Sequence, residues 1–342
     1  MERTANLGLV QWQRSRVQTR RSVGSFALLL VVGVLLSATL ATSIPLQFSI
    51  VTLFLFAGPH NWFELRYFLM RLPLRFGRSR NFFLTAFTGI ALLTIAYLSL
   101  PLLYYAGVWT GHNWPTAIAT WNTLLLLWLG LLISLRGKQG RRNWTWCWPV
   151  VFALSSLNWL GPELFSLALV YAHPLVALWF LDRHLRRNRP EWLQSYRRCL
   201  LMLPLIVAAM CWRLLGSQSL ADDNGLAWRI TQHAGADLLP QLSTHLLVTV
   251  HVFLETLHYG VWLLALPLIA SRGSIWKVKS IPLARHARGF PRLIGATLIG
   301  GLFVVALLWL GFSTNYAVTR DVYFAVAIAH VLAEAPFLLR ML

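Results

Sequence analysis

Long runs of apolar residues alternate along this chain with short segments rich in arginine. Several of the runs reach the ~18 residues that mark a membrane-spanning helix. Very short turns at Pro45 and at Gly161-Pro162 join neighbouring runs, which indicates helical hairpins. The pattern predicts ten spans, roughly at residues 25–43, 44–63, 82–105, 115–135, 145–160, 162–182, 197–215, 241–270, 291–313 and 319–340.

The arginines and lysines give this pattern an orientation. If the N-terminus is cytoplasmic, all 30 basic residues except Arg213, Arg229 and Arg320 fall in cytoplasmic segments or at their borders. Short cytoplasmic loops of membrane proteins carry such an excess of positive charge. We therefore expect both termini in the cytoplasm, a basic N-terminal segment at residues 1–24 and a single transmembrane domain at 25–342.

Composition supports the same class. Hydrophobic residues make up 57% of the chain and charged residues only 12%, with 17 Trp and 19 Phe. An all-α, multi-pass bundle in the lipid bilayer is predicted, and a bacterial inner membrane is the expected location. The net charge of +19 lies in loops that set topology, so no nucleic-acid partner is expected. The three cysteines have no metal-binding spacing and are expected to be unpaired thiols.

Ionisable residues inside the predicted spans are the main functional signal. Three spans each place a histidine and a glutamate one helical turn apart, and i, i+4 spacing puts both on one face. These residues are His60 with Glu64, the trio His251, Glu255 and His258, and His330 with Glu334. Such groups are costly at membrane depth and usually mark function.

Imidazole and carboxylate groups together suit non-haem iron, manganese or zinc, and Glu255-x-x-His258 has the form found in di-iron bundles. The sequence predicts a metal site, expected to hold one or two iron ions. The predicted ligands are His60, Glu64, His251, His258 and His330. Glu255 and Glu334 are the predicted catalytic or ligand-orienting carboxylates, and His173 and Glu163 are possible further members.

Ordinary structural roles remain open for several of these residues. Glu64 could pair with Arg66 or Arg71, and Glu334 could pair with Arg340. His184 and His286 lie in arginine-rich loops and are expected to be solvated. His233 is expected in an outer loop.

Two short motifs resemble the membrane carotene oxygenases of the Brp/Blh type. The stretch 58-GPHNWFE-64 is similar to that family's Pro-His motif with an acid four residues on. The stretch 323-YFAVAIAHVLAE-334 is similar in outline to its late histidine helix, with Glu334 where a second histidine is expected. The resemblance implies a polytopic enzyme that holds iron through histidines and cleaves β-carotene to retinal.

The leading hypothesis is therefore a membrane-embedded oxygenase or oxidoreductase acting on a hydrophobic small molecule. A proton-coupled transporter would use the same histidines and glutamates as a relay. A haem or quinone protein would use facing histidines, such as His173 and His258, as axial ligands. A structural membrane protein with satisfied polar groups is the fourth alternative. No specific protein partner is predicted.

Overall fold

The computed structural model describes residues 2–108, 110–111, 113–140, 142–221, 225–270, 278–286 and 289–342, with side chains from residue 23 onward except Tyr105 and Ala270. This described part is helical and contains no strand. The long helices are α1 (Glu2–Ser43), α2 (Pro45–Arg71), α3 (Arg80–Tyr105), α4 (Trp114–Gln139), α6 (Pro162–Asn188), α10 (Thr244–Gly260), α13 (Pro291–Thr314) and α14 (Tyr316–Leu339).

Shorter helices connect or extend the long ones. They are α5 (Cys147–Leu160), α7 (Pro190–Leu200), α8 (Met202–Leu214), α9 (Leu226–His233), α11 (Leu266–Ala270), α12 (Pro282–Arg285), the 3-10 turns η1 (Gly77–Ser79) and η3 (Val278–Ser280), and the π-helical segment η2 (Val261–Ala265). The predicted span at 197–215 is thus two helices, α7 and α8, which break at Leu201.

Within the described residues, seven helices are long and apolar enough to cross a membrane. These segments are Val23–Ser43, Gly77–Tyr104, Trp114–Gln139, Pro162–Asn188, Thr244–Ile269, Pro291–Thr314 and Tyr316–Leu339. Helix α2 has 27 residues but is less apolar, because it carries His60, Asn61 and Glu64 within five residues. It is packed against α13, α10, α1 and α14, so protein rather than lipid surrounds much of this polar stretch.

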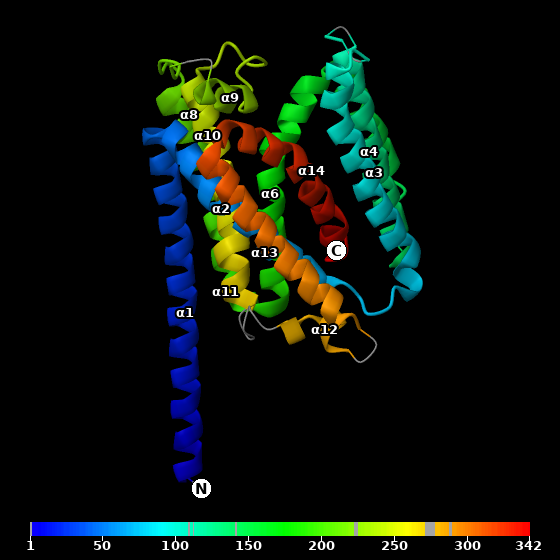
Figure 1. Ribbon diagram of the computed structural model, residues 1–342. Helices are drawn as coiled ribbons and strands as arrows, with labels where there is room; N and C mark the ends of the chain where they lie inside the picture. Colours follow the sequence, from blue (N-terminus) through cyan, green and yellow to red (C-terminus); the bar gives the residue numbers. More distant parts are fainter. Residues whose placement is uncertain are drawn as a thin grey trace.

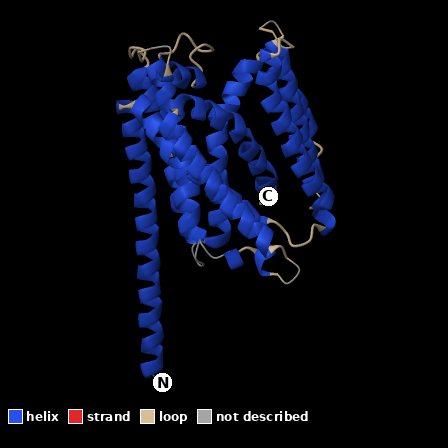
Figure 2. Cartoon of the chain, viewed as in Figure 1, coloured by secondary structure: helices blue, strands red, loops and turns tan. Residues whose placement is uncertain are grey.

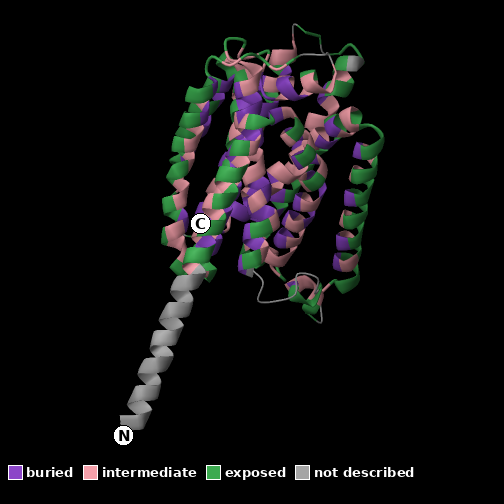
Figure 3. Ribbon diagram, turned by 90° about the vertical axis from the view of Figure 1, so that its left-hand side faces the viewer, coloured by how far each residue is buried: buried purple, intermediate pink, exposed green. Residues whose placement is uncertain are grey.

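Apolar side chains cover the outside of the bundle. Trp212 is 87% exposed and Leu160 is 85% exposed, and exposed positions run along the outward faces of the helices (Figure 3). A soluble protein does not leave apolar surface of this extent in water. The exposed surface is therefore that of a helical bundle suited to lipid.

Helices α2, α6 and α10 run from the top towards the bottom of Figure 1, and α14 runs in the same direction; α3, α4 and α5 form a neighbouring group (Figures 1 and 2). The last turns of α2, α4 and α6 carry basic residues, so we call the end of the bundle where these helices end the basic end. The common direction of four helices places equivalent positions on them at similar depth.

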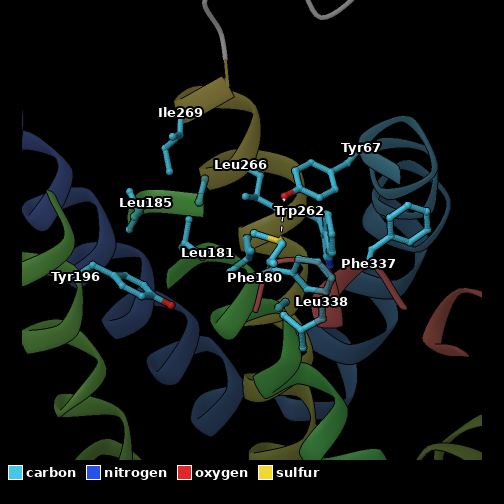
Figure 4. Packing of buried hydrophobic residues seen from close by; sticks show 14 of the residues in the cluster. Tyr67, Phe180, Leu181, Leu185, Tyr196, Trp262, Leu266, Ile269, Phe337 and Leu338 are labelled. Carbon is cyan, nitrogen blue, oxygen red and sulfur yellow. Dashed lines mark hydrogen bonds between the residues drawn. The ribbon is translucent and has the colours of Figure 1, made fainter. Parts of the chain in front are cut away.

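An aromatic layer fills the bundle near the basic end. We define it as Tyr67, Phe68, Phe180, Trp262 and Phe337, which come from α2, α6, η2 and α14 (Figure 4). The rings of Phe68 and Phe337 stack at 4.3 Å, and those of Phe180 and Trp262 lie 5.4 Å apart. Contacts of this kind add to the stabilisation from burial.

Truncation of this layer is expected to destabilise the bundle. Phe180→Ala should lower the free energy of unfolding by about 3–5 kcal/mol, because Phe180 is fully buried and the change leaves a cavity. The measurement is unfolding in detergent, followed by far-ultraviolet circular dichroism. Phe303→Ala is the control, since Phe303 is 63% exposed on α13. Equal losses in both variants would contradict the assigned packing.

Candidate metal centre

Four helices bring histidines together in the middle of the bundle. His60 comes from α2, His173 from α6, His258 from α10 and His330 from α14. The ring centroids of His60 lie 5.3 Å from those of both His258 and His330, and those of His173 and His258 lie 4.7 Å apart. The four imidazoles therefore form one contiguous cluster.

Two groups of these residues have ligand atoms close enough for a metal ion. The first is His60, Glu64, His258 and His330, and the second is His173, His258 and Glu334; in each, the ligand atoms lie within 4.8 Å of one another. Two ligands on opposite sides of one ion stand about 4.2 Å apart, given bonds of about 2.1 Å. Ligand atoms within 4.8 Å of one another approach this separation, so side-chain movements of about an ångström or less would bring either group onto an ion.

The second group has the composition of a known metal-binding pattern. Two histidines and one carboxylate, with the remaining positions open, are typical of non-haem iron sites. Nδ1 of His173 lies 3.3 Å from Oε2 of Glu334. Because His258 belongs to both groups, the two candidate sites adjoin and could hold one ion or a pair.

The polar atoms of the cluster lack other partners within the described part of the chain. Both carboxylate oxygens of Glu64 and of Glu334 are buried without a hydrogen bond, as are both ring nitrogens of His258 and Nδ1 of His330. Each of these carboxylates is only 1% exposed. Burial of an ionised group without compensation is strongly unfavourable, so a cation is the natural partner.

His60 is already oriented for such a role. Its Nδ1 lies 2.9 Å from the carbonyl oxygen of Phe56, which can only accept, so Nδ1 carries the proton. Nε2 is then the nitrogen left with a free lone pair. A backbone carbonyl that fixes the tautomer in this way is a common feature of metal-bound histidines.

The helices are irregular beside these residues. Pro59 precedes His60, Pro174 follows His173, and Pro336 comes two residues after Glu334. The π-helical segment η2 begins three residues after His258. Proline removes a backbone hydrogen bond, and π-helical turns are frequent at functional sites. The sequence showed the prolines, but the π-helical turn has no comparable signal.

The predicted arginine partners of the glutamates are engaged elsewhere. Arg66 donates to Met70 and Ser280, whereas Arg71 lies 3.2 Å from Nδ1 of His184. Arg340 donates to the carbonyl oxygen of Arg71. Glu64 and Glu334 therefore take part in the histidine cluster instead of these ion pairs.

His251 lies in a different layer, nearer the opposite end of the bundle, and Glu255 lies between it and the cluster, about one turn before His258. His251 precedes His258 by seven residues, a rise of about 10 Å along the helix. Its ring contacts Tyr171 at 5.7 Å and His233 at 5.1 Å, and neither metal-binding group in the described residues includes it. Glu255 accepts a hydrogen bond of 2.6 Å from the hydroxyl of Tyr259.

Of the two possible further members of the site, one lies in the cluster and the other does not. His173 joins the cluster, whereas Glu163 lies in the first turn of α6, ten residues before His173 and about 15 Å away along the helix axis. His233 was expected in a loop and instead ends α9, where its ring stacks on Phe324 at 4.1 Å. Tyr259, whose ring lies 4.6 Å from that of His60, was not predicted.

Metal content is the first test of this cluster. Protein purified in detergent should carry about one or two equivalents of metal by plasma mass spectrometry. His258→Ala should remove most of it, because His258 is common to both groups. His245→Ala is the matched control on α10, since His245 contacts only the carbonyl oxygen of Thr42 among its described partners. Equal metal in all three proteins would contradict the assignment.

No protein-family model, curated protein or solved structure matches the chain. The cluster of histidines and glutamates is therefore the main indication of its function.

Proposed function

We propose that this protein is a membrane-embedded, metal-dependent oxygenase acting on a hydrophobic small molecule. The observation that carries the proposal is the buried cluster of four histidines and two glutamates, with carboxylates that lack other partners. Iron is the proposed metal, because two histidines and one carboxylate in the second group are the ligand set typical of non-haem iron oxygenases. Such a metal would supply oxygen activation at the site.

The protein's own residues would then hold and shield the reaction site. Glu334 faces Nδ1 of His173 and can fix the orientation of that ring. The aromatic layer lies one to two turns from the cluster towards the basic end, and it separates the cluster from that face. A hydrophobic substrate is favoured, since the bundle offers its apolar outer surface to lipid.

The resemblance to Brp/Blh-type carotene oxygenases supports a carotenoid as the substrate to try first. Its two motifs contain His60, Glu64, His330 and Glu334, and all four belong to the cluster. A carotenoid is also long and apolar, so it would reach such a site from the bilayer.

Haem is less compatible with the cluster. Two axial histidines with bonds of about 2 Å on either side of an iron would place their ring centroids roughly 6 Å apart. Those of His173 and His258 lie only 4.7 Å apart. Those of His258 and His330 lie 6.4 Å apart, but the rings of His60 and His173 each lie within 5.6 Å of both. A porphyrin would have to separate rings that are in contact.

A proton-coupled transporter is the second candidate, and one observation favours it. Tyr259 donates a hydrogen bond to Glu255, and its ring lies 4.6 Å from that of His60 in the cluster. This carboxyl and hydroxyl pair could pass protons between the cluster and the opposite end of the bundle.

Oxygen-dependent turnover tests the proposed activity. Iron-loaded protein should consume oxygen with β-carotene and release a shorter aldehyde, detected by chromatography. Glu334→Gln should lower the rate by about 10-fold to 100-fold, because His173 loses its carboxylate partner. Glu163→Gln is the control on α6. Iron-loaded protein that cleaves neither carotenoids nor other apolar lipids would contradict an oxygenase and favour the transporter.

We also propose ten spans with both termini in the cytoplasm of a bacterial cell. Helices occupy all ten predicted segments, and the basic end gathers the arginine-rich connections. The domain division predicted from the sequence, at residues 1–24 and 25–342, stays part of this proposal.

Cysteine labelling on intact cells tests the orientation. In a variant without Cys147, Cys199 and Cys211, a membrane-impermeant maleimide should label Thr110→Cys but neither Arg78→Cys nor Arg142→Cys. All three positions are exposed, so burial does not decide the result. After permeabilisation all three should react. Labelling of Arg78→Cys in intact cells would reverse the proposed orientation.

A further inference from the structure

Four arginines converge at the basic end, one from the end of each of four helices. We call Arg71, Arg136, Arg187 and Arg340 the arginine cluster; they come from α2, α4, α6 and the residue after α14. Three of them donate hydrogen bonds to backbone carbonyl oxygens at the ends of α14 and α2, and Arg71 contacts His184. Arg136 donates to the carbonyl oxygen of Leu339 at 3.1 Å, Arg187 to that of Met341 at 3.0 Å, and Arg340 to that of Arg71 at 2.6 Å.

These guanidinium groups have neutral partners. None of the five ion pairs in the described part of the chain involves the arginine cluster. The nearby acids are already engaged, since Asp182 pairs with Arg197 and Glu191 pairs with Arg189. The cluster is thus a concentration of positive charge without a described counter-ion.

His184 lies beside the arginine cluster and has a ring N–H group without a described partner. The sequence predicted a solvated histidine here, but His184 is buried, with only 3% of its surface exposed. Its Nδ1 lies 3.2 Å from Nη2 of Arg71, and a guanidinium can only donate, so Nδ1 accepts. The ring proton of the neutral imidazole is then on Nε2, which is buried and has no partner in the described chain.

We propose that the arginine cluster and His184 bind a phosphate group at the cytoplasmic surface of the membrane. Guanidinium forks match phosphate oxygens in geometry and charge, and several of them on one anion outweigh their mutual repulsion. The cluster lies where four helices end, which is the depth of lipid headgroups. The phosphate comes from an anionic phospholipid or from a free phosphate compound.

Binding there would have a structural consequence. Three of the four helices that supply the arginine cluster, α2, α6 and α14, also supply ligand atoms to the candidate metal centre. An anion that neutralises the cluster would remove repulsion between the ends of these helices. The inference does not depend on the metal or on oxygen chemistry.

Two measurements on the unaltered protein test the proposal. Native mass spectrometry of the detergent-purified protein reports a bound phospholipid as an added mass. Thermal unfolding in inorganic phosphate, compared with chloride at equal ionic strength and pH, reports a free phosphate site. A retained anionic phospholipid identifies the lipid source, and a phosphate-specific rise in the unfolding temperature without a lipid adduct identifies the free ion.

Neighbouring arginines on α6 provide a matched pair of variants. Arg187→Gln should weaken phosphate or lipid binding about tenfold, the effect expected for losing one charged hydrogen bond. Arg186→Gln should leave binding unchanged, because Arg186 is exposed, as Arg187 is, but acts on neither Arg340 nor His184 among the described interactions. If Arg187→Gln does not fold, Arg136→Gln replaces it.

Two outcomes would overturn the proposal. One is an unaltered protein with neither a phospholipid adduct nor a phosphate-specific shift. The other is binding that Arg187→Gln and Arg186→Gln weaken equally, since that would indicate general attraction to a basic surface.

Discussion

The burial of Glu64 and Glu334 inside an apolar bundle is the constraint on which this structure depends. An isolated carboxylate at membrane depth costs about 3 kcal/mol or more, and two neighbouring ones also repel each other. Their oxygens accept no described hydrogen bond, although four imidazoles surround them. A bound cation resolves both problems together, because it attracts the carboxylates and uses the nitrogen lone pairs. The same residues without a cation would leave the centre of the bundle under strain.

The backbone is shaped around that centre. On each of the four helices, a proline or a π-helical turn lies within three residues of a histidine or glutamate of the cluster. A regular helix presents the same face at fixed intervals, whereas these interruptions change the direction of a side chain relative to the next turn. The π-helical segment η2, for example, begins three residues after His258 and itself carries Trp262 of the aromatic layer. Irregular backbone geometry in these helices therefore accompanies the one layer where their polar side chains meet.

Much of this was accessible from the sequence, because helical spacing is a local property. Apolar runs and arginine placement gave the helices, and i, i+4 spacing gave the pairs His60 with Glu64 and His330 with Glu334. Helical rise alone argues against His251 and His258 sharing one ion, since seven residues separate them by about 10 Å. His173 could not be assigned, because a single histidine has no neighbour whose spacing shows its role. The burial of His184 likewise depends on how α2, α6 and α14 end against one another, which no local pattern contains.

Layers of residues follow one another along the length of the bundle. From the opposite end inward lie the layer of His251, then the histidine cluster, then the aromatic layer, and last the arginine cluster at the basic end. The two charged layers have opposite signs, because the glutamates are central and the arginines lie at the end. The aromatic layer between them keeps water and the arginines away from the carboxylates, which would otherwise form ordinary ion pairs with Arg71 or Arg340. Separation of these charges by packed rings is what leaves the central carboxylates free for a metal and the arginines free for an anion.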